Sequence, residues 1–135
     1  MEKRSDMSSI FTKIVRGEVP CYKIYEDERT LAFLDIAPEA PGHTLVVPKV
    51  EVEKLYELDD EDYRAVMATV KKLAKHFDAV LGERMMIKVV GVDVPHAHVH
   101  ILPARAETEK GVRVEMTPEE LEAMAKKLRI EENEL

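Results

Sequence analysis

The sequence predicts an α+β fold: an antiparallel sheet of about five strands, with one long helix packed on it and short N-terminal and C-terminal helices. Three observations predict this fold. A chain of 135 residues that is 45% hydrophobic is long enough to bury one core. Short runs of alternating apolar and polar residues recur, and one longer segment repeats its apolar residues at helical spacing. We therefore expect a single domain over residues 8–135, after a polar, disordered N-terminus at residues 1–7.

The chain is expected to begin with a short helix and a hairpin. A serine at position 8 or 9 can cap a helix that runs through Arg16, and Gly17 can end it in the left-handed conformation. Alternation then predicts strands at residues 22–26 and 30–35. The three charged residues between them are typical of a hairpin turn.

A third strand and the long helix follow. The strand is expected at residues 43–47, between a turn rich in proline and Pro48. Asp59 can cap the helix and Gly82 can end it. Its apolar stripe consists of Tyr63, Val66, Met67, Val70, Leu73, Ala74, Phe77 and Val80.

Two strands and a helix complete the expected fold. The strands are expected at residues 85–90 and 97–102, and they are the expected partner surface for the apolar stripe of the long helix. Residues 117–120 read Thr-Pro-Glu-Glu, a capping box with proline at the first helical position. This box predicts a helix that ends at about Arg129.

Charge and composition exclude several classes of function. The net charge of −7 disfavours binding of a nucleic-acid polymer, whereas a local pocket could still hold a small phosphorylated ligand. One cysteine cannot form an intramolecular disulfide, which fits a reducing compartment. Because the sequence has neither a long apolar run nor the pattern of a secretory signal, we expect a cytoplasmic protein without membrane contact.

The strongest chemical signal is the alternation of His96, His98 and His100. Side chains two residues apart on a strand share one face, so the three imidazoles are expected to line one surface while the intervening apolar residues face the core. Three interpretations remain open at this point. The histidines could decorate an exposed sheet face, ligate zinc or copper, or perform nucleophilic and acid–base chemistry.

The segment around these histidines resembles the motif of the histidine triad (HIT) superfamily, in its Hint-like or generic bacterial branch. The resemblance covers roughly residues 9–49 and 86–103. Outside the triad it rests on four segments whose order and spacing are similar to those of the family, namely residues 9–20, 25–27, 31–38 and 40–49. It implies a HIT-like fold.

The resemblance also implies an activity: a hydrolase or transferase acting at the α-phosphate of nucleoside monophosphate derivatives, such as a purine nucleoside phosphoramidase. His98 matches the nucleophile that takes up the nucleotidyl group. His100 and His43 match histidines that contact the phosphate or orient the pocket, and His96 matches the histidine that supports the nucleophile. The alternative is a nucleotide-binding or regulatory module of the same fold with weak or no catalysis.

The resemblance further implies a site for a small nucleotide such as an AMP or GMP derivative, and a homodimer. Asp35 matches the carboxylate that receives the ribose hydroxyls, a role that suits an acceptor of two donors. The apolar walls around the base are matched by Ile10, Phe11, Ile14, Phe33 and Ile36.

Two departures from the family pattern concern metal and phosphate. Many bacterial members hold a structural zinc with two cysteines and a histidine, and this chain has Ser9, Thr12 and Glu51 there, so we expect no metal and no cofactor. The loop before the triad is several residues shorter than usual, and Asp93 stands where a hydroxyl donor is expected. A carboxylate there repels phosphate, so we expect slow turnover of ordinary adenosine phosphoramidates.

Overall fold

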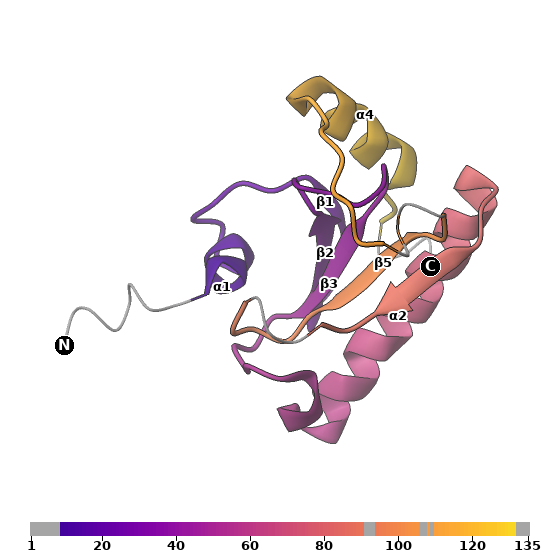
Figure 1. Cartoon of the computed structure of the whole chain (residues 1–135). Helices are drawn as coiled ribbons and strands as arrows, with labels where there is room; N and C mark the ends of the chain where they lie inside the picture. Colours follow the sequence, from indigo (N-terminus) through magenta and orange to yellow (C-terminus); the bar gives the residue numbers. More distant parts are fainter. Residues whose placement is uncertain (1–8, 91–93, 106–107, 109, 132–135) are drawn as a thin grey trace.

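Five strands of the described chain form one antiparallel sheet in the order β1-β2-β3-β5-β4. This computed structural model describes residues 9–90, 94–105, 108 and 110–131 (Figure 1). The strands are β1 (Lys23–Glu26), β2 (Thr30–Leu34), β3 (Thr44–Pro48), β4 (Met85–Lys88) and β5 (Val99–Pro103). The helices are α1 (Ile10–Val15), α2 (Asp60–Leu81) and α4 (Pro118–Leu128), with a 3₁₀ turn at Leu55–Glu57. The predicted α+β fold is confirmed.

The larger core lies between one face of the sheet and the helices α2 and α4. Alternate residues of the strands, such as Ala32, Val46 and Val99, point toward these helices and are fully buried. The helical side of this core contains Val66, Val70, Leu73 and Phe77 of α2 and Leu121, Ala125 and Leu128 of α4. The expectation that α2 packs on the last two strands was too narrow, because its stripe also covers β2 and β3.

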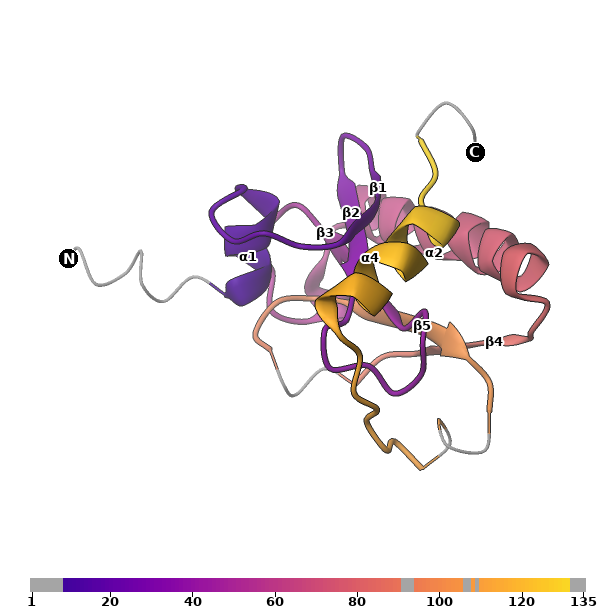
Figure 2. The same cartoon turned by 90° about the horizontal axis from the view of Figure 1, so that it is seen from above.

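Helix α1 covers part of the opposite face of the sheet. Phe11 packs there on Leu31, Phe33, Leu45 and Val47, which alternate with the residues of the larger core. Figures 1 and 2 show α1 and α2 on opposite sides of the sheet. The face under α1 is therefore separated from the main core by the sheet itself.

The three helix starts agree with the sequence, because each depends on local capping chemistry. The side chains of Ser9, Asp59 and Thr117 accept backbone N–H groups at the starts of α1, α2 and α4. The predicted capping box at Thr117 is complete. Gly82 ends α2 in the left-handed conformation, as expected.

Several boundaries and exposures differ from the prediction. Strand β5 begins at Val99, so His96 and His98 lie in the segment before it rather than inside the strand. Strand β4 ends at Lys88 instead of residue 90, and Tyr63 of the predicted apolar stripe is 44% exposed. The predicted disordered residues 1–7 lie outside the described part of the chain. Within the described residues, every helix is too short or too polar to cross a membrane.

Candidate active site

The histidines of the triad gather with His43 on the sheet face that α1 covers. His100 belongs to β5, where it pairs with Leu45 on β3 and Lys88 on β4, so these three side chains share one face. All four imidazoles are buried, with at most 5% of any one residue exposed. The interpretation of an exposed, decorated sheet face is therefore wrong.

His98 presents one ring nitrogen as a base. Its Nδ1 lies 2.7 Å from the backbone oxygen of His96, and a carbonyl oxygen only accepts, so Nδ1 carries the hydrogen. In the neutral ring, the lone pair is consequently on Nε2. The ring packs edge-on against Phe11 and His100, with both centroid distances 5.1 Å. Packing and the backbone bond together fix the orientation of this imidazole.

His96 ties helix α1 to the segment that carries His98. Its Nε2–H donates to the backbone oxygen of Pro48 at 2.9 Å. Its Nδ1 then accepts from one of the hydroxyls of Ser9 and Thr12, whose oxygens lie 2.9 and 3.0 Å from Nδ1 and 3.2 Å from each other. Burial lowers the pKa of His96, which keeps the ring neutral and this pattern intact.

A chain of hydrogen bonds joins His43 and His100. The backbone N–H of Glu39 donates to Nδ1 of His43 at 3.0 Å, so the hydrogen of the neutral His43 ring is on Nε2. That Nε2–H donates to Nδ1 of His100 at 2.9 Å. The Nε2–H of His100 is then left buried and without a partner among the described residues. A buried donor without a partner is destabilising unless a ligand accepts its hydrogen bond.

Burial also keeps this pair of imidazoles neutral. It lowers the pKa of His43 against the opposing attraction of Asp35 and Glu39. Burial, together with the charges of His43 and His98, lowers the pKa of His100 to about 4. Near pH 7 both rings therefore act through their N–H groups and lone pairs rather than as cations.

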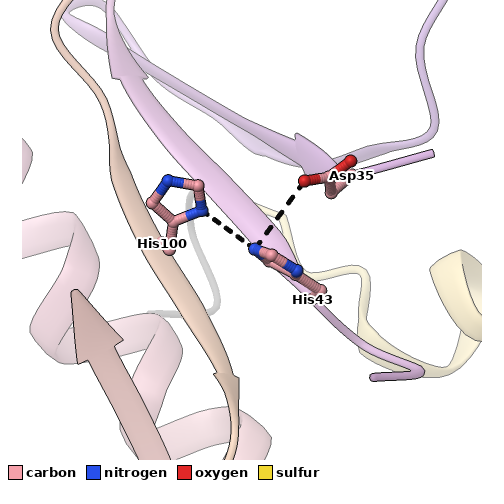
Figure 3. A group of neighbouring side chains, drawn as sticks. All are labelled: Asp35, His43 and His100. Carbon is pink, nitrogen blue, oxygen red and sulfur yellow. Dashed lines mark hydrogen bonds and ion pairs between the residues drawn. The ribbon is translucent and has the colours of Figure 1, made fainter. Parts of the chain in front are cut away.

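Asp35 stands beside His43 at the end of β2. One carboxylate oxygen accepts the backbone N–H of Ala37 at 2.9 Å, which is a local turn contact. The other lies 3.8 Å from Nε2 of His43 (Figure 3). The same oxygen lies 3.3 Å from the Arg113 guanidinium. Arg113 also donates to the backbone oxygen of Ala37.

Asp35, His43 and His100 could in principle hold a metal ion, because one ligand atom from each lies within 4.8 Å of the others. The hydrogen bonds argue against it. A neutral imidazole that binds a metal through Nε2 carries its hydrogen on Nδ1. In His43, Nδ1 already accepts the N–H of Glu39, so a hydrogen there would face another hydrogen. We therefore interpret the group as a hydrogen-bonded pair with a neighbouring carboxylate.

The predicted base-binding residues line one cavity of about 240 Å³ next to this cluster. Phe11 connects the two, since it lines the cavity and packs against His98. The predicted residues around the cavity are Ile10, Phe11, Ile14, Phe33, Asp35 and Ile36, and they are joined by Val19, Pro20, Cys21, Leu34 and Leu45. Ile10 and Ile36 are 45% and 69% exposed, which makes them available to an entering ligand.

Sequence reasoning missed Glu39, Lys88 and Arg113. Their partners are distant in the sequence, and no local motif marks them: Lys88 forms an ion pair with Glu39, and Arg113 reaches Asp35. The alternation of β4 was the one available signal for Lys88, because it predicts a side chain on the face of the histidines once the strand pairing is known. Asp93, a predicted site residue, lies outside the described part of the chain.

Comparison with known proteins identifies the family and agrees with the fold. A family model described as the HIT domain matches residues 16–107. The chain is 39% identical to adenosine 5'-monophosphoramidase of Schizosaccharomyces pombe, over 90% of this chain and 96% of that protein. A crystal structure of a HIT-like protein from Bartonella henselae superposes with a TM-score of 0.80 at 35% identity, covering 90% and 93% of the two chains. A zinc-bound histidine triad family protein from Mycobacterium smegmatis gives 0.78 at 32% identity, covering 91% of each.

Proposed function

The chain belongs to the HIT family, whose members include nucleotide hydrolases, and from this membership and the site geometry we propose that it hydrolyses or transfers nucleoside monophosphate derivatives through a nucleotidyl-histidine intermediate. The proposed substrates are phosphoramidates of AMP or a related purine nucleotide. The observation that carries the proposal is the orientation of His98. Its Nδ1–H is bound to a backbone carbonyl, which leaves Nε2 as a nucleophile of fixed direction.

The proposed reaction has two displacements. Nε2 of His98 attacks the α-phosphorus, a nitrogen–phosphorus bond forms, and the bond to the leaving amine breaks as the amine takes a proton from solvent. Water then attacks the same phosphorus, the bond to Nε2 breaks, and the proton returns to solvent. A covalent intermediate of this kind replaces one difficult step by two easier ones.

The other histidines orient groups and donate hydrogen bonds in this proposal. The buried Nε2–H of His100 would donate to a phosphoryl oxygen and so gain the partner that it lacks. His43 fixes the direction of that donor, because its own Nε2–H occupies Nδ1 of His100. His96 supplies the carbonyl oxygen that orients the nucleophile.

The nucleoside would occupy the cavity beside the cluster. Its volume of about 240 Å³ lies below the ~300–1,000 Å³ of pockets for drug-sized ligands, which suits a base with part of its ribose. Phe11 and Phe33 offer flat apolar surfaces to the base. Asp35 would accept the ribose hydroxyls through the oxygen that faces Arg113, because its other oxygen holds the Ala37 turn.

Two further properties belong to the proposal. We propose a homodimer that joins the sheets of two chains along the free edge of β4, in a cytoplasmic protein. Support for the dimer comes from Ile87 on this edge and from Val89 and Val90 directly after it, which are 48%, 50% and 40% exposed.

Trapping of the intermediate tests the enzymatic proposal. The protein is mixed with AMP-lysine labelled at the phosphate, denatured at alkaline pH, and assayed for label on the chain. The wild type and His76→Asn are expected to carry label, whereas His98→Asn, which keeps a side-chain donor for the His96 carbonyl, is expected to carry none. Equal labelling of wild type and His98→Asn would overturn the assignment. If neither the wild type nor any variant is labelled while AMP still binds, the chain is a nucleotide-binding module instead.

A further inference from the structure

We propose that Lys88 is the cation that receives the phosphate of the nucleotide, an inference that rests on the proposed function and adds a residue to it. The side chain stands on β4 next to His100 and forms an ion pair with Glu39 at 2.8 Å. These two contacts place a positive charge at the rim of the histidine cluster. Lys88 would thus act on the phosphate directly and determine how strongly the site prefers a charged ligand.

The pairing of the strands puts Lys88 on the correct face. Lys88 is the direct partner of His100 in the antiparallel pair β4·β5, and directly paired residues project to the same side of a sheet. Leu45 pairs with His100 from the other neighbour, so the three side chains form one row across the sheet. Because β4 is the last strand in the order, Lys88 ends this row and keeps 28% of its side chain exposed.

Glu39 connects Lys88 to the hydrogen-bonded histidines. Its carboxylate, with 7% of the side chain exposed, binds the Lys88 ammonium, while its backbone N–H holds Nδ1 of His43. One residue thereby fixes both the cation and the ring that orients His100. An ordinary solvated surface lysine has no such buried partner.

The charges around the site are consistent with Lys88 as the cation that binds the phosphate. The two carboxylates, Asp35 and Glu39, would repel an incoming phosphate, and the neutral imidazoles cannot compensate for them. Of the described residues, Arg113 and Lys88 are the cations that pair with these carboxylates, and Arg113 also donates to the backbone oxygen of Ala37. An ammonium group has three donors, and the Glu39 contact uses one of them, so Lys88 can bind a phosphoryl oxygen without leaving the buried carboxylate unpaired.

The same charge supports the protonation pattern of the site. Burial is the main cause of the low pKa values of His43 and His100, and Lys88 contributes in the same direction for both rings. This direction agrees with the position of Lys88 beside His100 in the pairing of β4 and β5.

Binding of AMP and of adenosine to the full chain separates a phosphate contact from a structural role. Lys88→Met is expected to weaken AMP binding about ten- to hundred-fold and to leave adenosine binding within about two-fold, since only AMP carries the charge. Lys49→Met is the matched control. Lys49 has the same exposed fraction of 28% and forms an ion pair of the same 2.8 Å with Glu26, a residue of β1. Lys49→Met is expected to change neither the affinity for AMP nor the affinity for adenosine.

A second pair of variants avoids an unpaired buried carboxylate. Glu39→Gln keeps the backbone N–H to His43 and is expected to bind AMP at least as tightly as the wild type. The double variant Glu39→Gln with Lys88→Met should lose affinity for AMP relative to Glu39→Gln alone. This comparison remains valid if Lys88→Met by itself does not fold.

The outcomes distinguish the two proposals. If the wild type binds AMP and both variants that lack Lys88 bind it as tightly as their parents, the role of Lys88 is wrong while the proposed function stands. If Lys88→Met weakens the binding of AMP and of adenosine equally, the role of Lys88 is also overturned, because that result indicates a structural lysine. Failure of the wild type to bind AMP would overturn both proposals. Binding of AMP without uptake of label would overturn the enzymatic proposal alone, and the binding comparison would still decide the role of Lys88.

Discussion

Three of the four histidines of the site each have one ring nitrogen bound to a backbone group, which cannot change its hydrogen-bonding role. For His98 and His96 the partners are backbone carbonyls, and for His43 the partner is the backbone N–H of Glu39. Backbone groups do not titrate, so the tautomers follow from the fold rather than from solution conditions. The fold thereby assigns a separate role to three chemically identical side chains.

Buried neutral imidazoles predict a loss of stability in acid. The pKa of His100 is about 4 in the folded chain against 6.5 in the unfolded chain, so the unfolded state binds more protons between these values. The neutral His100 ring therefore contributes to the free energy of unfolding. This contribution is fully present above pH 6.5, falls as the pH is lowered, and is lost as the pH passes about 4. His100→Asn, which keeps an acceptor for His43, should lose less free energy of unfolding between pH 7.5 and 4.5 than the wild type, by at most about 3 kcal/mol.

Urea unfolding at the two pH values measures this difference, and His76→Asn on α2 serves as the control histidine. The prediction is wrong if His100→Asn and His76→Asn show the same pH dependence as the wild type.

At the residue scale, the site residues that belong to a sequence motif could be predicted, and those that belong to no motif were missed. The structure brings the triad, His43, Asp35 and the apolar wall residues to one place, and their roles stay predictions. Glu39 and Lys88 could not be found in the same way. Their contact joins a turn before β3 to the edge strand β4, and such a contact follows from strand pairing, which a single sequence does not encode locally.

At the scale of elements, local chemistry decided the success of the predictions. Helix caps depend on side chains within about four residues, so the starts of α1, α2 and α4 could be read directly. The start of β5 could not, because a strand begins where its neighbours pair with it. The pairing with β3 begins at Val99, and the two histidines before it make side-chain contacts instead.

The turn before β3 supplies a prediction at this scale. Gly42 has a φ of +100°, and an added Cβ would lie 3.3 Å from Leu81 at the end of α2 and 3.7 Å from Leu128 of α4. Gly42→Ala is therefore expected to destabilise the fold by more than the ~1–2 kcal/mol of backbone strain alone, and to displace His43. Gly17→Ala is the matched control, because Gly17 has a φ of +79° and open space around it.

Urea unfolding and phosphoramidate turnover should separate the two glycine variants. Gly17→Ala is expected to lose stability only, whereas Gly42→Ala should lose more stability and also turnover. Equal losses in both assays would show that crowding at Gly42 has no effect.

At the scale of the whole molecule, the described residues leave the β4 edge of the sheet without a paired strand. The β1 edge is covered by the C-terminal segment, where the Ile130 N–H donates to the backbone oxygen of Ile24 and Arg129 donates to that of Lys23. Along β4, the apolar side chain of Ile87 is 48% exposed. The order of the strands was not predicted, since β5 lies between β3 and β4 and that arrangement depends on contacts between distant segments.

The proposed dimer can be tested at this edge. Sedimentation at micromolar concentration is expected to give twice the chain mass of 15.4 kDa for the wild type. Ile87→Lys should shift the protein toward the monomer, because a charge on an edge strand opposes pairing with another sheet. Val112→Lys changes a residue of similar exposure, 53%, outside this edge and should leave the dimer intact. A wild-type monomer would contradict the prediction.

The contact between α1 and His96 has a consequence for the conditions under which the site can form. Two hydroxyl groups and one imidazole make this contact, and hydroxyls are neither the thiolates that zinc selects nor groups that oxidants couple into a disulfide. The backbone carbonyl that orients His98 belongs to the same anchored residue. A shortage of zinc or exposure to peroxide would therefore leave the contact between α1 and His96 unchanged. The proposed nucleophile, His98, would keep its orientation under conditions that break a contact made by cysteines.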